Sequence, residues 1–448
     1  MLASSATCAM LASEMKAVSR WIAALGGIGL AAAALAQNVD QAFHSILSAP
    51  AVIKALADLR ADDARTFEEQ KTLTEIPSPP FKEQARAAYY LKRLREVGLS
   101  DAYIDREGNV LGARKGRGSG PKLAISAHLD TVFPEGTDVT VKEKDGRYYA
   151  PGIGDDTRGL VELLAVLRAM DANALSTVGD VLFVGTVGEE ELGDLRGVKA
   201  LFRDHPDIDG FISLDGDRIG RIVNRATGSH RYEAIFKGPG GNSFGAFGLP
   251  SAIHAMGRAI AKISEVRTPS SPKTTFTVGI VRGGTSVNAI AGDARMGIDM
   301  RSDSMDELLK LEKTILAHVR DAAAEENRRW NADGITVELK LIGDRPAGRT
   351  PEDSKIVHVA RRSLRALGQQ ATLDSASTDS NLAMSLGIPA VTISHGGDHQ
   401  AMHSLNESYK PTDAWLGPQN ALLVVLGLAG LDGVSPPLLE ARKPGGSR

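Results

Sequence analysis

The sequence is nearly devoid of cysteine. Its single cysteine, Cys8, lies in the first 36 residues of a 448-residue chain. The remainder of the chain can form no disulfide bond, and it has no thiolate for nucleophilic catalysis or for a sulfur-based zinc site. Any metal centre must therefore be built from histidine and carboxylate ligands.

A surplus of charge of one sign is also missing. The chain has 52 Lys and Arg residues against 55 Asp and Glu residues, which gives a formal net charge of −3. Because the two signs are evenly mixed, the sequence predicts no basic face, and we expect no nucleic acid as partner. The apolar fraction of 42% and the charged fraction of 24% are typical of globular proteins, and the length predicts two or three domains.

Long hydrophobic runs are confined to the N-terminal segment. A short basic stretch starting at Met15 precedes the apolar run Trp21 to Ala36, and Ala34-Leu35-Ala36 fits an A-x-A cleavage site. We therefore expect residues 1–36 to be a signal peptide, Met15 to be the natural start, and the protein to be exported to a periplasm or secreted. The run is shorter than the roughly 18 residues that a membrane-spanning helix needs, so we expect no stable membrane anchor.

Strands and helices alternate in the rest of the chain. Residues 37–98 have a helical pattern that is broken once, at the prolines of 77–80, which predicts two helices. Further on, KLAISAH, DVLFVGTV and GFISLD read as buried strands separated by helices. This alternation predicts an α/β fold with a mostly parallel sheet.

A different pattern occupies residues 222–342. The order strand, helix, strand, strand, helix, strand is that of a ferredoxin-like α+β unit. We expect this unit to be inserted between two halves of a catalytic domain, residues 37–221 and 343–435. The Pro- and Gly-rich tail, 436–448, is expected to be disordered.

Histidine and acidic residues follow the predicted strands. His128, the pair Glu189-Glu190 and Asp215 each come just after a strand, where open α/β sheets collect their ligand-binding groups. Asp130 lies two residues beyond His128, and a metal-ligating imidazole usually donates its second N–H to such a carboxylate. We therefore expect these side chains to converge at one edge of the sheet.

Taken together, the motifs resemble a known enzyme family. Their order and spacing are similar to those of the co-catalytic zinc metallopeptidases that include glutamate carboxypeptidase, peptidase T, aminoacylase and succinyl-diaminopimelate desuccinylase. The resemblance covers nearly the whole chain after the N-terminal segment. It implies a zinc-peptidase catalytic domain of the phosphorylase/hydrolase-like type with an inserted dimerisation (lid) domain. The motifs that carry it are His128-x-Asp130, Asp155-Asp156, Glu189-Glu190, Asp215 and His403 in MHSLNE.

The resemblance also implies a role for each of these residues. Asp155 would bridge two zinc ions, His128 and Asp215 would complete one site, and Glu190 and His403 the other. Glu189 would be the general base and Asp130 the partner of His128. Neutral imidazoles and carboxylates hold zinc while leaving room for water, although manganese or cobalt would accept the same ligands.

Three of these assignments have alternatives. The run Glu189-Glu190-Glu191 allows a shift of one residue, and the positions of Gly193 and Gly197 favour the first two glutamates. Asp156 could bridge instead of Asp155, or could cap the following helix. His395 and His399 compete with His403, which alone is followed by Ser-x-x-Glu.

Three residues of the inserted domain are candidates for binding substrate. The resemblance suggests contacts from Asn288 and Arg301, and the guanidinium could pair with a substrate carboxylate. Asn242 stands where many relatives carry a histidine that reaches the scissile carbonyl, often of the partner subunit. An asparagine can donate a hydrogen bond but cannot be cationic, which puts turnover of ordinary peptides in question.

The function expected from this resemblance is that of an exported zinc exopeptidase. The GDDTRG and SLDG segments favour a di- or tripeptide aminopeptidase like peptidase T. A carboxypeptidase or N-acyl-amino-acid deacylase is the alternative that Arg301 would equally serve, and a peptide-binding relative without catalysis is an alternative of another class. We expect a homodimer formed through an edge of the inserted domain.

Overall fold

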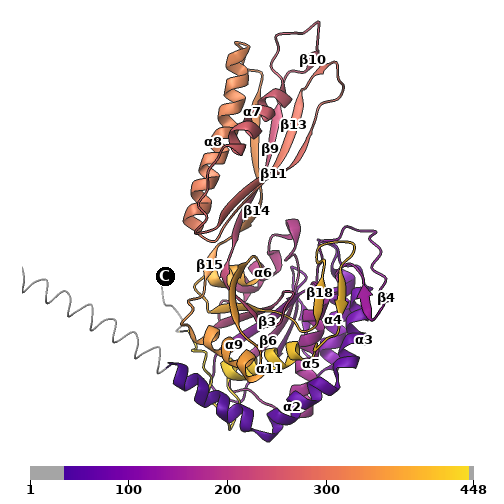
Figure 1. Ribbon diagram of the computed structural model, residues 1–448, viewed down its shortest axis with the longest axis vertical. Helices are drawn as coiled ribbons and strands as arrows, with labels where there is room; N and C mark the ends of the chain where they lie inside the picture. The colour runs from indigo at the N-terminus through magenta and orange to yellow at the C-terminus, as the bar shows by residue number, and fades with distance from the viewer. Residues whose placement is uncertain (1–34, 443–448) are drawn as a thin grey trace, which may run out of the picture.

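The computed structural model describes residues 35–442, and Figure 1 shows a larger and a smaller body, each built on its own sheet. The larger sheet has nine strands in the order β1-β2-β6-β3-β7-β17-β8-β15, and β16 pairs with β8. Their bounds are β1 Tyr103–Ile104, β2 Val110–Arg114, β3 Lys122–His128, β6 Asp180–Thr186, β7 Gly210–Leu214, β8 Arg221–Ala226, β15 Gly348–Arg349, β16 Thr372–Ala376 and β17 Ala390–Ile393.

The middle of this sheet is parallel. Strands β6, β3, β7 and β17 pair in parallel register, whereas β2 and β8 flank them in antiparallel orientation. All of β3 beyond Lys122 is buried, as a strand covered on both faces requires. The predicted α/β class with a mostly parallel sheet is thus confirmed, and the carboxyl ends of β3, β6 and β7 lie side by side.

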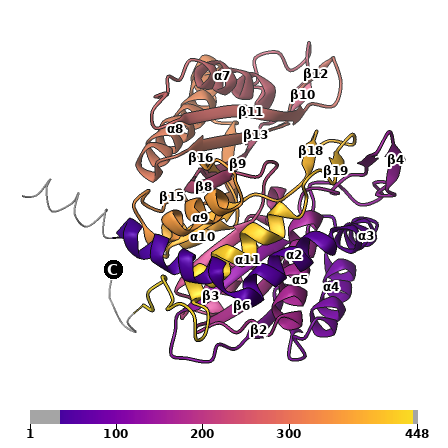
Figure 2. The same cartoon turned by 60° about the horizontal axis from the view of Figure 1, so that its bottom comes forward.

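Helices cover both faces of the larger sheet (Figure 2). The last of them, α11, is buried along nearly its whole length between its neighbours. One face carries α2 Pro50–Ala61, α4 Gln84–Glu96, α5 Thr157–Ala172, α9 Lys355–Ala366 and α11 Leu416–Ala429, with α3 Asp63–Thr74 beside α5; the other carries α6 Arg196–Asp204 and α10 Ser380–Ser385.

The N-terminal helices differ from the prediction. The pattern predicted one helix before the proline-rich break, but the chain forms α2 and α3, which are separated at Asp62. Arg168 of α5 donates to Asp62 at 2.9 Å and so holds the junction against the core. The expected signal peptide falls mainly on residues 1–34, outside the described range; Leu35 and Ala36 begin a helix that runs to Ser48.

No single helix within 35–442 is long and apolar enough to cross a membrane. The helix Leu35–Ser48 and α2 pass such a test only as a pair bent by 74°.

The smaller body has the β-α-β-β-α-β order that the sequence predicts. Its sheet runs β11-β13-β9-β14, all antiparallel, with α7 and α8 packed on one face. The bounds are β9 Gly228–Lys237, α7 Ala252–Ser264, β11 Thr274–Gly283, β13 Asp293–Ser302, α8 Met305–Arg329 and β14 Thr336–Arg345. We call it the lid. The expected boundary at 222 falls inside β8, which belongs to the larger sheet.

A third, small sheet lies beside the strand ends of the larger one. Its order is β18-β19-β5-β4, with bounds β4 Lys142–Lys144, β5 Arg147–Tyr149, β18 Asp398–Gln400 and β19 Ser408–Lys410. The loop between β18 and β19 carries His403.

The expectation of a disordered tail is wrong for residues 436–442. Leu438 and Leu439 are buried, and their N–H groups donate to the carbonyls of Gly427 and Leu428, both at 3.1 Å. Two adjacent leucines bury enough apolar surface to hold an otherwise polar segment against α11. Residues 443–448 lie outside the described range.

Candidate metal centre and active site

The residues that follow two strands line one cavity, and the end of a third strand lies directly behind its wall. His128 is the last residue of β3, Glu189 and Glu190 follow β6, and Asp215 follows β7. The cavity has a volume of about 610 Å³. Its wall includes Asp155, Glu189, Glu190, Glu191, Asp215, Asp217, Arg218, Arg221, Arg231, Arg301, Arg345, Asp374 and His403.

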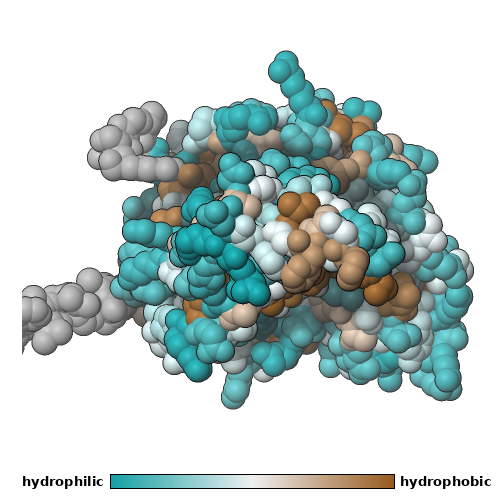
Figure 3. All heavy atoms as spheres, turned by 90° about the horizontal axis from the view of Figure 1, so that it is seen from above, coloured by the Kyte–Doolittle hydropathy of each residue, from teal (hydrophilic) through white to brown (hydrophobic). Residues whose placement is uncertain are grey.

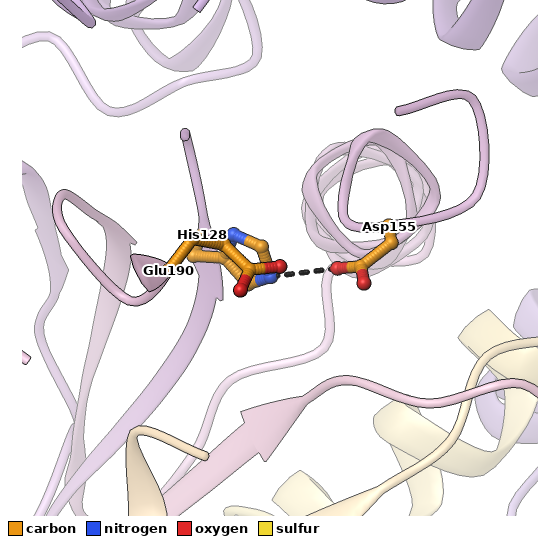
Figure 4. Close-up of side chains that lie close together, drawn as sticks. All are labelled: His128, Asp155 and Glu190. Carbon is orange, nitrogen blue, oxygen red and sulfur yellow. Dashed lines mark hydrogen bonds and ion pairs between the residues drawn. The ribbon is translucent and has the colours of Figure 1, made fainter. Parts of the chain in front are cut away.

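Asp155 links two histidines. His128 Nε2 lies 2.8 Å from Asp155 Oδ1, and His403 Nε2 lies 2.8 Å from Asp155 Oδ2. Figure 4 shows the contact with His128, with Glu190 alongside. One carboxylate thus reaches a different imidazole with each oxygen, which is the placement that a residue bridging two cations needs.

Glu190 completes this cluster. Its Oε1 lies 3.1 Å from His403 Nε2, and ligand atoms of His128, Asp155 and Glu190 all lie within 4.8 Å of one another. Burial, with the negative charge of Asp155 nearby, raises the pKa of Glu190 to about 8. The same two causes raise the pKa of Asp215 well above its usual value.

This donor set fits divalent cations. Buried carboxylates that repel one another are stable as anions only when opposite charge is supplied. The two imidazoles and three carboxylates present are ligand types that zinc, manganese and cobalt accept. The cluster therefore has the ligand types of a metal centre, and its negative charge is of the kind that bound cations would balance.

Asp130 orients its neighbours through its main chain and its carboxylate. Its carbonyl lies 3.0 Å from His128 Nδ1, whereas its carboxylate is 3.7 Å away, too far for a hydrogen bond. The carboxylate instead accepts the N–H groups of Glu189 and Glu190, at 3.1 and 2.8 Å. Asp130 thus ties the ends of β3 and β6 together.

Of the residues that competed for these roles, Asp156, His395 and His399 do not line the cavity, whereas Glu191 does. Asp156 Oδ2 accepts the N–H of His128 at 2.7 Å and Oδ1 lies 2.7 Å from His395 Nε2, so its carboxylate is engaged behind the cavity wall. His399 Nε2 contacts the Gly396 carbonyl at 3.2 Å, and burial lowers the pKa of His399 to about 3. Glu191 is exposed.

The substrate-binding candidates are divided between two places. Arg301 lines the cavity, where its Nε donates to Asp299 at 2.7 Å. Asn242 lies in the short strand β10 Gly241–Asn242, and Asn288 lies just before β12 Ala289–Ile290, with which β10 pairs. Both asparagines are exposed and neither lines the cavity of its own chain; Figure 1 places β10 at the far end of the lid.

Two functional contacts were missed from the sequence. Arg345, at the end of β14, donates to Glu189, which is 5% exposed. Glu407 accepts the N–H groups of Gly152, Gly154 and Asp155 at 2.9, 2.8 and 3.1 Å. A signal for the second existed, since Glu407 is the glutamate of the Ser-x-x-Glu pattern after His403.

Replacing Glu407 by alanine should both destabilise the protein and weaken metal binding. Three buried N–H groups around Asp155 would lose their acceptor, so we expect the free energy of unfolding to fall by about 2–4 kcal/mol. The affinity for metal should fall by about 10- to 100-fold. Urea unfolding and metal titration measure the two effects. Glu352→Ala, at an exposed position, is the control, and equal behaviour of the two variants would contradict the prediction.

Comparisons with known proteins agree with this geometry. The model of peptidase family M20/M25/M40 matches residues 124–422. The acetylornithine deacetylase of Myxococcus xanthus is 27% identical over 391 residues, which cover 81% of this chain and 93% of that protein. The first curated relative matched is 34% identical, but the chain spans only 34% of its length.

Solved structures share the fold. Aminopeptidase PepT from Bacillus cereus superposes with a TM-score of 0.67 at 23% identity, covering 81% of this chain and 98% of that one. The YXEP protein of Bacillus subtilis, described as a dinuclear metal binding peptidase, gives 0.61 at 18% identity, covering 82% and 98%. With the family model matching most of the chain around the cluster just described, the chain belongs to peptidase family M20/M25/M40.

Proposed function

We propose that the protein is a zinc-dependent exopeptidase that cleaves an amide bond of di- or tripeptides. The observation that carries the proposal is the position of Asp155 between His128 and His403, with Glu189 on the same cavity wall. Bound zinc would supply Lewis acidity and a water of lowered pKa. Glu189 would take the proton of that water and deliver it to the leaving amine.

The arginines of the cavity favour substrates with a free carboxylate. Arg231 and Arg301 both donate through Nε to the single carboxylate of Asp299, at 3.1 and 2.7 Å. Because two positive guanidinium groups share one negative carboxylate, the group formed by Arg231, Arg301 and Asp299 has a net positive charge. Cleavage next to a free carboxyl end, or removal of an N-acyl group from an amino acid, is therefore the second candidate function.

Pairing of two copies and export are further parts of the proposal. Strand β11 is an edge of the lid sheet with Ile280 and Val281 exposed, and Phe244 and Val287 are exposed near β10. Figure 3, which views the molecule from the lid end, shows hydrophobic atoms among the hydrophilic ones. A second copy on this surface would give Asn242 a route toward the neighbouring cavity. The N-terminal segment supports export.

Elemental analysis together with a peptide panel tests the proposal. We expect two metal ions per chain, and hydrolysis of short peptides that is lost on chelation and restored by zinc. Free, N-blocked and C-blocked di- and tripeptides separate the candidates. A requirement for a free amino end supports the aminopeptidase, and a requirement for a free carboxylate alone supports the carboxypeptidase or deacylase. Metal-loaded protein that hydrolyses none of these would contradict the proposal.

A further inference from the structure

The last residue of the lid sheet reaches the proposed general base. Arg345 ends β14 and is 4% exposed. Its Nη1 donates to Glu189 Oε1 at 3.2 Å and to Ser377 Oγ at 3.2 Å, and its Nη2 donates to the main-chain carbonyl of Glu189. The guanidinium of Arg345 thus donates hydrogen bonds to both the side chain and the main chain of Glu189. Within residues 35–442, the Glu189 carboxylate receives no other hydrogen bond from the protein.

The charges around Glu189 make this contact important. Asp155, Glu189 and Glu190 are all buried and line the same cavity, so their negative charges repel one another. Arg345 supplies the opposite charge. Burial alone would lower the pKa of Arg345, but the attraction of Glu189 and Glu190 outweighs burial and raises it. The guanidinium therefore stays charged at any working pH.

Neighbouring glutamates must perform different tasks at this site. Glu190 lies 3.1 Å from His403 and within the cluster of metal-ligand candidates. An unrestrained Glu189 carboxylate, one residue away, would be drawn to the same cations, and a carboxylate that ligates metal is a poorer base. The planar fork of an arginine fixes two acceptors at once, which a lysine ammonium does not.

We propose that Arg345 is a positioning residue that holds Glu189 in the role of general base and keeps it from joining the metal ligands. The inference rests on the proposed function, since it concerns the base of that reaction. It also gives the lid a direct connection to the chemistry, because Arg345 belongs to the strand by which the chain leaves the lid.

Arg345→Ala and Arg345→Lys test this role in the full-length, zinc-loaded protein. For the alanine variant we expect kcat to fall by about 100-fold, KM to change little, and metal content to stay at that of the unchanged protein. Guanidinium ion, added below denaturing concentration, should restore part of the rate. The lysine variant keeps the charge without the fork and should lie between. With cobalt in place of zinc, the visible bands should change as Glu189 becomes a ligand.

Lys199→Ala is the matched control. Lys199 Nζ donates to the carbonyl of Asp344, the residue before Arg345, at 2.8 Å and makes no contact with Glu189. Its loss removes a neighbouring lid contact, so we expect an unchanged kcat and no response to guanidinium. If Arg345→Ala does not fold, the kcat of Arg345→Lys tests the proposal instead. A kcat of Arg345→Lys equal to that of the unchanged protein would overturn the proposal.

Other outcomes are equally decisive. A raised KM with unchanged kcat in Arg345→Ala would assign the arginine to substrate binding and overturn the positioning role. A loss of rate with no guanidinium rescue and an unaltered cobalt spectrum would leave only a structural role. Absence of hydrolysis by the unmodified metal-loaded protein would instead reject the proposed function, so the two failures are distinguishable.

Discussion

Replacing Glu189 by glutamine is expected to lower kcat by about 10²- to 10⁴-fold while the bound metal is retained. Glutamine preserves the shape of the side chain and can still accept a hydrogen bond from Arg345, which now contacts Glu189 Oε1 at 3.2 Å. It cannot take a proton. Steady-state kinetics with the best peptide of the panel, combined with elemental analysis, measure both quantities on the same sample.

Two further variants, Glu190→Gln and Glu191→Gln, test which of the three adjacent glutamates is the base. Glu190→Gln should lose metal together with activity, because Glu190 belongs to the cluster with His128 and Asp155. Glu191→Gln should have little effect, because Glu191, although it lines the cavity, is exposed and does not belong to the cluster of His128, Asp155 and Glu190. An inactive Glu191→Gln and an active Glu189→Gln would shift the assignment by one residue. Unchanged activity in all three would rule out a glutamate base in this segment.

The strand ends of the larger sheet could be predicted from the sequence because they are local features. A buried apolar run ending in a histidine or an acid, as in KLAISAH and GFISLD, indicates both a parallel strand and the edge where ligands gather. The ordering of β3, β6 and β7 then brings Glu190 and Asp215 to the wall of one cavity and places His128 directly behind it, against Asp155. This prediction needed only the pattern of buried strands and the rule that open α/β sheets bind ligands at the carboxyl ends of their strands.

Contacts between distant segments could not be predicted in the same way. Arg345 and Glu189 are 156 residues apart, and an arginine at the end of a lid strand looks like any exposed strand-end charge in the sequence. The Asp130 carboxylate likewise accepts the N–H groups of Glu189 and Glu190, after β6, to which no local pattern connects it. Leu438 and Leu439 are buried and hold the tail against the core, although the proline- and glycine-rich composition of the tail predicted disorder.

Asp155→Asn should abolish metal binding almost completely, and activity with it. Asp155 places Oδ1 2.8 Å from His128 Nε2 and Oδ2 2.8 Å from His403 Nε2, so it is the residue shared by both halves of the proposed centre. An amide offers a single neutral oxygen in place of two anionic ones, and it cannot balance two adjacent cations. Elemental analysis after gel filtration, and recovery of activity with added zinc, measure the loss.

Asp156→Asn is the matched control because it makes the same chemical change one residue further along. Asp156 accepts the N–H of His128 at 2.7 Å, and an asparagine oxygen can keep that bond. Its other oxygen faces His395 and not the cavity, so both metals should remain bound with at most a moderate loss of rate. If Asp156→Asn lost the metals and Asp155→Asn kept them, the bridging role would pass to Asp156. The contact between Asp155 and His403 argues against that result, since it brings the loop between β18 and β19 to Asp155 and not to Asp156.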